Sequence, residues 1–271
     1  MKTIEGAAQE GRTRSVLVTG AAGGLGRAIV AELRDQDWAV IATDRDGADL
    51  DGLRAEYRHV TGVDVRTLDV TDHSSVMGVA DRLDSLTALV NVAGVLQDPV
   101  PLRGLEEEAQ RRIWEVNYFG AVRCTRLLTP LMNQGTGCVV NITSINQLSP
   151  LPLYAYAPSK AALGCFTRLA AGELAIRGIR VNAVAPGFTL TPALAARIRL
   201  GERDPESIER HTASGRLVQP REVATAVAFL LGDAAGGITG ATLPVDAGWL
   251  ATAHWMDFGD RLDRWEDPAV R

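Results

Sequence analysis

Residues 154–160, YAYAPSK, bring two tyrosines close to one lysine in the sequence. Residues four apart share a face of an α-helix, whereas residues six apart point to different sides. Tyr156 lies four residues before Lys160, and Tyr154 lies six before it. Pro158 fits the first turn of a helix, and the apolar run after it has helical spacing. The spacing therefore favours Tyr156 as the partner of Lys160, with Tyr154 as a pocket wall or a packed aromatic.

A tyrosine and a lysine on one helix face suit proton transfer. Free tyrosine has a pKa of about 10, which is too high for efficient work near neutral pH. A neighbouring ammonium group favours the tyrosinate form. An isolated pair of this kind is more often an ordinary surface or packing feature, so the rest of the chain has to support the chemical interpretation.

A glycine-rich segment near the start of the chain, VLVTGAAGGLGRAIV, has the pattern of a strand, a turn and a helix. Gly20, Gly24 and Gly26 allow the backbone to turn tightly and to approach a pyrophosphate. The N–H groups at the start of the helix then favour the phosphate charge. The alternative is a tight turn with no ligand, but the flanking strand and helix favour a dinucleotide site.

Asp44 follows the next predicted strand, 18 residues after Gly26. A carboxylate at this place accepts hydrogen bonds from the adenosine ribose and repels the additional phosphate of NADP. Arg45 can instead pair with that phosphate. We predict NAD in preference to NADP. The alternative role for Asp44 is only to cap the turn.

Short β-rich apolar runs alternate with helical patterns along the chain. This alternation predicts an α/β fold, a doubly wound Rossmann-type parallel seven-stranded sheet with helices on both faces, in a single domain. The predicted strands are 15–20, 38–43, 63–69, 86–94, 137–143, 179–187 and 241–246. The predicted helices are 25–36, 73–84, 105–133, 155–177 and 220–232, with a small helix between the second and third strands.

The composition bounds the classes of function. The chain has 271 residues, of which 46% are apolar, and a net charge of −5, so a large core is expected and nucleic acid is not. Cys124, Cys138 and Cys165 are expected to be reduced, buried thiols of a cytoplasmic protein. The four histidines form no cluster with the spacing of metal ligands, so no metal site is expected. No apolar run is long enough to predict a membrane span. Residues 1–14 are expected to form a flexible arm, 15–250 the catalytic domain, and 251–271 a tail.

The motifs together resemble those of the short-chain dehydrogenase/reductase family over about residues 15–250. They are TGAAGGLG (19–26), Asp44, LDVTD (68–72), NVAG (91–94), VNYFG (116–120), NITS (141–144), YAPSK (156–160), APG (185–187) and LPVDAG (243–248). The chain departs from the family at Val92, where a second asparagine is usual. The loop between Ser144 and Tyr156 is also about one residue shorter than in many members, so Thr143 stays an alternative to Ser144.

The resemblance implies hydride transfer between a nicotinamide cofactor and a secondary alcohol or ketone. The implied catalytic residues are Asn117, Ser144, Tyr156 and Lys160, with Asn117 interrupting its helix to hold a water that connects Lys160 to solvent. The implied cofactor-binding residues are Gly20, Gly24, Leu25, Gly26, Asp44, Arg45, Asp69, Val70, Asn91, Ala93, Gly94, Tyr156, Lys160, Pro186, Gly187 and Thr189.

The substrate side is less specific. We expect a lid at 188–215, or a plain surface helix pair there, and a small substrate with apolar and polar groups. The expected substrate residues are Leu96, Gln97, Ser144, Asn146, Gln147 and Tyr156, with Leu148 beside them. The chain is loosely similar to 2,3-dihydro-2,3-dihydroxybenzoate dehydrogenases, which act on dihydrodiols. The alternatives are a 3-oxoacyl reductase that uses NADPH and a non-catalytic protein that senses NAD or acts as a scaffold.

The resemblance also implies a homodimer or homotetramer, in which helices 105–133 and 155–177 pair with their copies. The tail contains Trp255, Phe258 and Trp265, and a disordered tail is usually poor in aromatic residues. We expect it to dock, either on its own subunit or across a subunit boundary.

Overall fold

A computed structural model describes residues 14–254 of the chain. The predicted N-terminal arm lies outside this range apart from Arg14, and the predicted docking of Trp255, Phe258 and Trp265 lies outside it as well.

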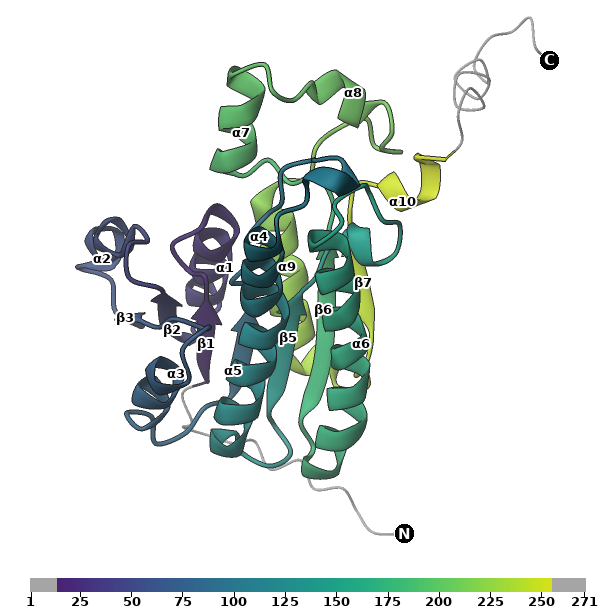
Figure 1. Cartoon of the computed structure of the whole chain (residues 1–271). Helices are drawn as coiled ribbons and strands as arrows, with labels where there is room; N and C mark the ends of the chain where they lie inside the picture. Colours follow the sequence, from purple (N-terminus) through teal and green to yellow (C-terminus); the bar gives the residue numbers. More distant parts are fainter. Residues whose placement is uncertain (1–13, 255–271) are drawn as a thin grey trace, which may run out of the picture.

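The described chain folds around one seven-stranded parallel sheet with the strand order β3-β2-β1-β4-β5-β6-β7 (Figure 1). The doubly wound sheet predicted from the sequence is confirmed. The strands are β1 (Ser15–Thr19), β2 (Ala39–Asp44), β3 (Val63–Thr67), β4 (Ala88–Asn91), β5 (Cys138–Ile142), β6 (Arg180–Pro186) and β7 (Thr242–Val245).

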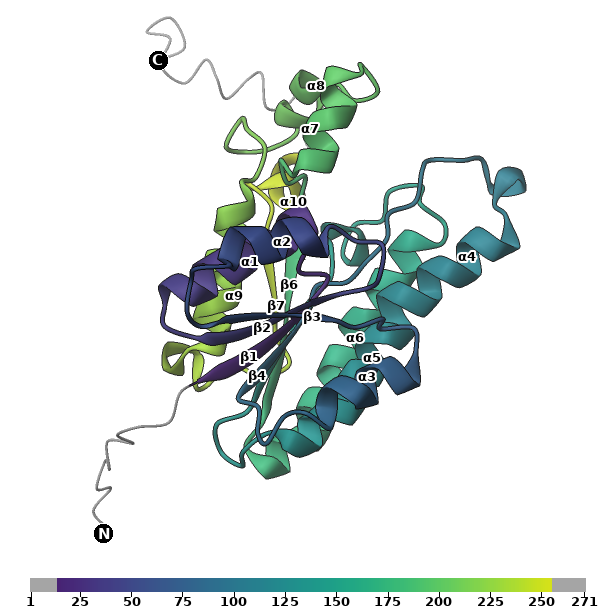
Figure 2. The ribbon, with the colours of Figure 1, turned by 90° about the vertical axis from the view of Figure 1, so that its left-hand side faces the viewer.

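Helices cover both faces of the sheet, as Figure 2 shows with the sheet seen along its edge. On one face lie α1 (Gly24–Asp35), α2 (Leu50–Tyr57) and α9 (Pro220–Leu231), and on the other lie α3 (His73–Ala80), α4 (Glu107–Trp114), α5 (Ala121–Leu128) and α6 (Tyr156–Leu174). Three short helices, α7 (Pro192–Arg199), α8 (Pro205–Glu209) and α10 (Trp249–Thr252), stand above the carboxyl edge of the sheet.

The two-residue period of a strand sends alternate side chains into two separate cores. In β1, Val16 and Val18 pack with α1 and α9, whereas Leu17 packs with the helices of the other face. All three side chains are fully buried. The edge strand β3 is an exception to the expected apolar character, because Asp64 and Arg66 form a surface ion pair of 2.7 Å there.

The single long helix predicted at 105–133 is interrupted in the structure. A π-helical turn, Glu115–Gly120, separates α4 from α5, and a 3₁₀-helical turn, Thr129–Leu131, follows α5. Turns of the π type occur mostly as single-turn insertions and often at functional sites. This turn carries Asn117, which the family resemblance places at such an interruption.

The three cysteines are all free thiols, and they differ in burial. Cys124 and Cys138 are buried as expected, but Cys165 is exposed, because it lies on the outward face of α6. Burial raises the pKa of the Cys124 thiol to about 12 and that of Cys138 to about 11, so both stay protonated thiols. Within residues 14–254, the helices are all too short or too polar to cross a membrane.

Candidate active site

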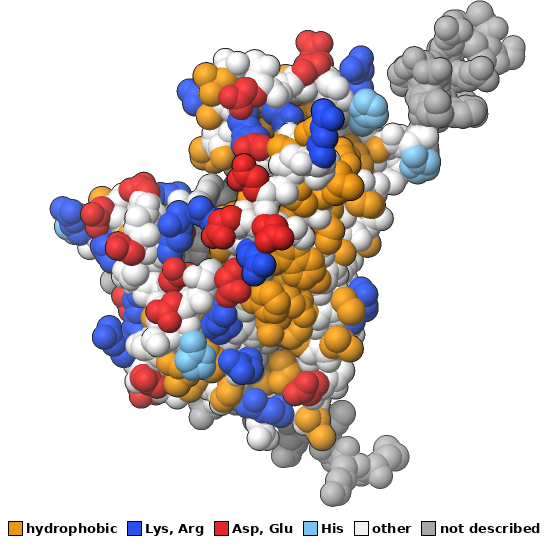
Figure 3. Space-filling model, in the orientation of Figure 1, with side chains coloured by type: hydrophobic (Ala, Val, Ile, Leu, Met, Phe, Trp, Pro, Cys, Tyr) orange, Lys and Arg blue, Asp and Glu red, His pale blue; other side chains and the backbone are white. Residues whose placement is uncertain are grey.

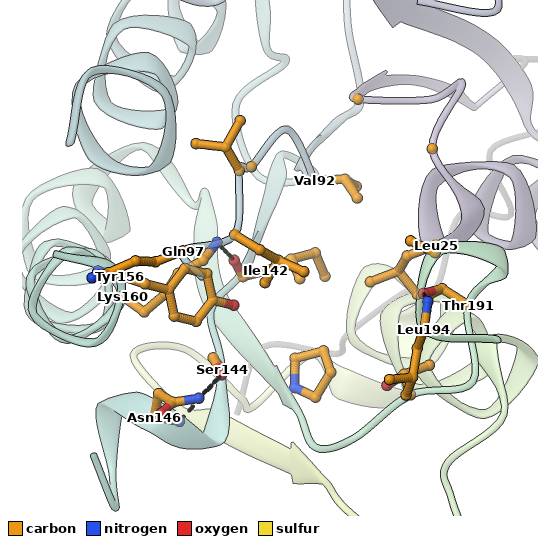
Figure 4. A pocket seen from close by; sticks show the side chains of 18 of the residues that line it. Leu25, Val92, Gln97, Ile142, Ser144, Asn146, Tyr156, Lys160, Thr191 and Leu194 are labelled. Carbon is orange, nitrogen blue, oxygen red and sulfur yellow. Dashed lines mark hydrogen bonds between the residues drawn. The ribbon is translucent and has the colours of Figure 1, made fainter. Parts of the chain in front are cut away.

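A cavity of about 1200 Å³ opens at the carboxyl edge of the sheet, over the ends of β1 and β4. Strand order reverses between these two strands, and open α/β sheets bind ligands at this switch point. The cavity extends from the glycine-rich turn before α1 to the loop after β5, and α7 and α8 form its outer wall (Figure 4). In Figure 4 the Tyr156 hydroxyl points towards the open centre, opposite Leu25, Thr191 and Leu194.

The glycine-rich turn is packed too closely for side chains at two positions. Gly20 has φ +65°, and a Cβ there would lie 2.7 Å from the backbone of Ala93. A Cβ on Gly26 would collide with the carbonyl oxygen of Gly20, so α1 packs directly on the turn. Thr19 ties the two loops together, because its Oγ1 accepts hydrogen bonds from the N–H groups of Val92 (3.1 Å) and Ala93 (3.2 Å). These contacts leave the backbone of the turn open to the cavity.

Asp44 stands at the end of β2, beside this turn. Its Oδ2 accepts a hydrogen bond from the Ala22 N–H (3.0 Å), and its Oδ1 accepts one from the Arg45 N–H (2.8 Å). The carboxylate therefore braces the glycine-rich turn, and it also lines the cavity. The Arg45 side chain is exposed and forms no ion pair with any residue in 14–254.

Tyr156 is the first residue of α6 and Lys160 lies one turn further along the helix, as their spacing predicts. Both side chains are buried, with exposed fractions of 9% and 3%. The Lys160 Nζ lies 5.8 Å from the centroid of the Tyr156 ring and donates a hydrogen bond to the Ile142 carbonyl (2.8 Å). Tyr154 is 41% exposed and is not among the residues that line the cavity. The expectation that Tyr154 is a pocket wall or a packed aromatic is wrong.

Burial dominates the protonation of this pair. It raises the pKa of Tyr156, and a hydrogen bond with Ser144 lowers it in part. Burial also lowers the pKa of Lys160 to about 8. The ammonium charge that favours tyrosinate is therefore present at neutral pH and is lost as the pH rises above about 8.

Asn117 is completely buried behind the cavity wall. Its Oδ1 accepts a hydrogen bond from the Val95 N–H (2.8 Å), and its Nδ2 donates to the Val95 carbonyl (3.0 Å). A Cβ on Gly94 would lie 3.4 Å from both the Asn117 Oδ1 and the Lys160 Nζ, so the three residues are in close contact. This contact places Asn117 next to Lys160, and its role in a water relay stays a prediction.

Ser144 follows β5 and faces the cavity near Tyr156 (Figure 4). Its Oγ also accepts hydrogen bonds from the backbone N–H and the Nδ2 of Asn146, both at 3.2 Å, so it caps the short turn that follows. The hydroxyl of Thr143 donates to the Val184 carbonyl (3.0 Å). Because that hydroxyl is engaged with the backbone, the geometry favours Ser144 over Thr143.

Most of the predicted ligand residues come together in this cavity. It is lined by Gly20, Gly24, Leu25, Gly26, Asp44, Arg45, Asp69, Val70, Ala93, Gly94, Leu96, Gln97, Ser144, Asn146, Tyr156, Lys160, Pro186, Gly187 and Thr189.

Three predicted ligand residues are not among those that line the cavity. Asn91 turns into the core, where its Nδ2 donates to the Thr125 Oγ1 (3.1 Å) and to the Asn141 Oδ1 (2.8 Å). Gln147 lies against α6, at the place where Gly164 leaves room for its Oε1. Leu148 is 53% exposed and points away from the cavity lining. Asn91 is the last residue of β4, whereas Gln147 and Leu148 lie in the turn after β5.

The outer wall contains residues that the sequence analysis did not single out. Leu194, Arg197, Arg203 and Ile208 line the cavity from α7, α8 and the segment between them. Arg197 forms an ion pair of 2.6 Å with Asp98, which lies in the loop after β4. The predicted lid is thus a helix pair that bounds the cavity. Asp98 and Arg197 are 99 residues apart, so no local sequence pattern indicates that they form an ion pair.

Comparisons with known proteins agree with this geometry. A family model described as Enoyl-(Acyl carrier protein) reductase matches residues 20–250. A crystal structure of an oxidoreductase of the short-chain dehydrogenase/reductase family from Burkholderia thailandensis has a TM-score of 0.84 and 30% sequence identity, with coverage of 93% of this chain and 98% of that chain. The chain belongs to the short-chain dehydrogenase/reductase family. As a short-chain dehydrogenase/reductase it is an oxidoreductase that uses a nicotinamide cofactor and a small-molecule substrate.

Relatives of this chain are named as dehydrogenases of hydroxylated rings or as 3-oxoacyl-[acyl-carrier-protein] reductases. Cis-4-hydroxycyclohexanecarboxylate dehydrogenase of Sinomonas cyclohexanicum is 39% identical over 252 residues, which cover 88% of this chain and 97% of the relative. The 3-oxoacyl-[acyl-carrier-protein] reductase of Thermotoga maritima is 35% identical, with coverage of 86% and 96%. A structure of ElxO with NADP bound has a TM-score of 0.83 and 29% identity, with coverage of 89% and 100%.

Proposed function

We propose that this protein transfers a hydride between NAD and the secondary alcohol or ketone of a small substrate, cyclic alcohols being the favoured class, with Tyr156 as the acid/base. The observation that carries the proposal is the meeting of Tyr156, Lys160 and Ser144 in one cavity with the glycine-rich turn. The names of the relatives support the reaction class.

Each residue has a separate part in the proposed reaction. The nicotinamide cofactor supplies the hydride acceptor or donor. The Tyr156 hydroxyl exchanges the proton of the substrate alcohol, and the Ser144 Oγ holds the substrate oxygen. Lys160 supplies positive charge below Tyr156 and holds the nicotinamide ribose, and Asn117 positions a water behind Lys160.

The residues present fit a dinucleotide. The closely packed turn at Gly20 and Gly26 leaves backbone N–H groups available to a pyrophosphate, and the positive end of α1 favours its charge. Leu25 and Gly24 share this turn. We place the adenine beside Asp69 and Val70, and the nicotinamide beside Pro186, Gly187 and Thr189. Ala93 and Gly94 lie between these two ends.

The preference for NAD rests on Asp44. Two backbone N–H groups hold its carboxylate at the mouth of the site, where it would accept from ribose hydroxyls and repel a phosphate. NADP is the second candidate, because the exposed Arg45 can pair with a phosphate and because the similar ElxO has been solved with NADP bound.

The substrate part of the cavity combines apolar and polar walls. Leu96, Leu153, Phe188 and Leu194 provide apolar surface, whereas Asn146 provides a polar group next to Ser144. This combination suits a compact ring that carries a hydroxyl group. A 3-oxoacyl reductase is the second candidate activity, supported by the 35% identity to the Thermotoga maritima enzyme.

An absorbance assay for NADH tests the proposal. The purified protein would be incubated with cyclic secondary alcohols, with NAD or NADP, and separately with a 3-oxoacyl thioester and NADH or NADPH. We expect the cyclic alcohols with NAD to be the fastest combination. Faster reduction of the thioester with NADPH would replace the proposal with the second candidate, and no turnover with any combination would refute both.

We also infer that the protein forms a homodimer or homotetramer. Hydrophobic side chains gather over the face formed by α5 and α6 (Figure 3). Phe119, Leu169 and Ile176 are 47%, 69% and 92% exposed in this region. Exposed apolar surface of this kind marks an interface when it is contiguous.

A further inference from the structure

Gln97 connects the loop after β4 to the first turn of α6. Its Oε1 accepts hydrogen bonds from the backbone N–H of Ala155 (2.8 Å) and from that of Tyr156 (3.1 Å). The first N–H groups of a helix have no partner within the helix, so this side chain caps α6 from a distant loop. The capped residue Tyr156 is the proposed acid/base itself.

The two donors determine which way the amide of Gln97 points. Backbone N–H groups only donate, so the atom facing both of them is the amide oxygen, and the NH₂ group points the other way. The side chain is nine-tenths buried, and its Nε2 has no hydrogen-bond partner among residues 14–254. A buried donor without a partner destabilises a fold, and each such group calls for an explanation.

A glutamate at this position would supply the same acceptor oxygen without the unpaired donor. It would also place a negative charge beside the backbone of Tyr156. The first turn of α6 contains no acidic residue, so the positive end of this helix is not neutralised by its own side chains. A positive helix end favours the tyrosinate form of Tyr156, and an acidic cap would weaken that effect.

The charged groups around this end of α6 lie on α6 itself, on α4 and on the π-helical turn. Lys160 lies one turn along α6, and Arg112 and Glu115 line the cavity from α4 and the π-helical turn beside it. Glu115 is paired with Arg123 at 2.7 Å. The Tyr156 carbonyl accepts a hydrogen bond from the Ser159 hydroxyl (2.7 Å), and the Tyr156 N–H donates to Gln97. The side chain that caps this N–H therefore carries no charge.

We propose that Gln97 is a positioning residue of the reaction: it holds the backbone of Tyr156 in place by a neutral cap and so leaves the positive end of α6 to stabilise tyrosinate. This role rests on the proposed function of Tyr156. It extends the sequence-based expectation, which placed Gln97 at the substrate, because the structure directs its oxygen to the helix.

Two substitutions separate the cap from its neutrality. Gln97→Met keeps the length of the side chain and removes the acceptor, whereas Gln97→Glu keeps the acceptor and adds charge. Gln147→Met is the matched control, because Gln147 also has a buried Nε2 without a partner and also packs on α6, but outside the cavity. Unfolding midpoints and the dissociation constant of the cofactor would show that each variant is folded.

The rate of hydride transfer in a single turnover tests the positioning role. We expect Gln97→Met to lower this rate by about tenfold to a hundredfold, since small misplacements of a reacting group have effects of this size. Gln97→Glu should recover part of the loss, and Gln147→Met should keep the rate of the unmodified protein. An unchanged rate in folded Gln97→Met that still binds the cofactor would overturn the positioning role.

Direct titration of Tyr156 tests the neutrality of the cap without any substrate. The chain has four tyrosines, so ¹³Cζ-labelled tyrosine gives few NMR signals, and Tyr156→Phe assigns the one of interest. We expect Gln97→Glu to raise the pKa of Tyr156 by about one unit, as a like charge nearby does. An unchanged pKa would overturn the electrostatic part. Failure of the proposed function is distinct, because it appears as an inactive unmodified protein whose Tyr156 still titrates.

Discussion

Tyr156 and Tyr154 lie two residues apart but have opposite surroundings. Tyr156 is buried beside Lys160 and Ser144, whereas Tyr154 is 41% exposed. We expect Tyr156→Phe to lower kcat by at least about a hundredfold, the usual contribution of a general acid or base, with cofactor affinity nearly unchanged. Tyr154→Phe should retain most activity. Steady-state kinetics and a cofactor titration of both variants check this, and the reverse order of effects would contradict the assignment.

Lys160 is one of two lysines in the chain, and the other is Lys2. Its buried side chain has a pKa lowered from 10.5 to about 8, so the folded state carries a burial penalty while the lysine is charged. Between about pH 8 and 10.5 the folded state releases this proton and the unfolded state keeps it. Stability from this group therefore rises with pH across that window.

Replacing Lys160 by methionine removes this penalty. We expect Lys160→Met to abolish turnover and to be more stable than the unmodified protein at pH 7 by up to about 3 kcal/mol, at 1.36 kcal/mol for each pKa unit. The loss of the donor to the Ile142 carbonyl reduces this gain. Urea unfolding of both proteins at pH 7 and pH 10 measures this gain in unfolding free energy, and the gain should be smaller at pH 10. Labelled-lysine NMR, with only two signals, measures the pKa directly.

Asp44 is expected to decide the choice of cofactor. Asp44→Ala removes the carboxylate that would bond the ribose and repel the phosphate of NADP. It should weaken NAD binding by about tenfold, as the loss of a charge-assisted hydrogen bond of about 1.5 kcal/mol does, and improve NADP relative to NAD. Fluorescence titrations of both cofactors check the shift. A preference of the unmodified protein for NADP would show instead that Arg45 dominates.

Among the elements, α7 and α8 are the least firmly held part of the cavity wall. Neither helix contains a buried residue, which is typical of segments that open at low cost. The ion pair between Arg197 and Asp98 crosses from α7 to the loop after β4, and its side chains are 34% and 73% exposed. Exposed ion pairs contribute about 0.2–1 kcal/mol to stability, so this pair holds α7 only weakly against the loop after β4.

Removing the Asp98–Arg197 ion pair should weaken binding of the substrate more than binding of the cofactor. We expect Asp98→Asn to raise the KM of the alcohol by about twofold to fivefold, the factor that corresponds to a surface ion pair, with the dissociation constant of NAD unchanged. Asp51→Asn is the matched control, because it removes the Asp51–Arg54 pair on α2, away from the cavity. Equal KM values in the two variants would contradict a role for α7 as a lid.

At the scale of the whole molecule, apolar side chains are exposed on both layers of helices. Phe119 and Leu169 lie on the layer with α5 and α6, and Phe229 lies on α9 in the opposite layer, where it is 44% exposed. Aromatic packing among Trp114, Tyr118, Phe119 and Phe166 strengthens the first face. A dimer needs one such face, and a tetramer needs both.

Charge substitutions on each face distinguish these assemblies. We expect Leu169→Glu to dissociate the protein to a smaller species, because it buries a carboxylate in an apolar interface. If the unmodified protein is a dimer, Phe229→Glu should leave its mass unchanged. If the unmodified protein is a tetramer, Phe229→Glu should halve its mass and leave a dimer. Sedimentation velocity of both variants measures the mass. An unmodified protein that sediments as a monomer would contradict both assemblies.

The sequence by itself determined the sheet, the glycine-rich turn and the pairing of Tyr156 with Lys160. These features depend on the residues within one strand, turn or helix, where periodicity and backbone conformation leave few choices. The tertiary structure decided where the polar side chains after the strands point. Gln97 and Gln147 looked equivalent in the sequence, yet one caps the turn that carries Tyr156 and the other packs beside Gly164. Their directions, like the pairing of Asp98 with Arg197, depend on contacts between segments far apart in the chain, which no local pattern records.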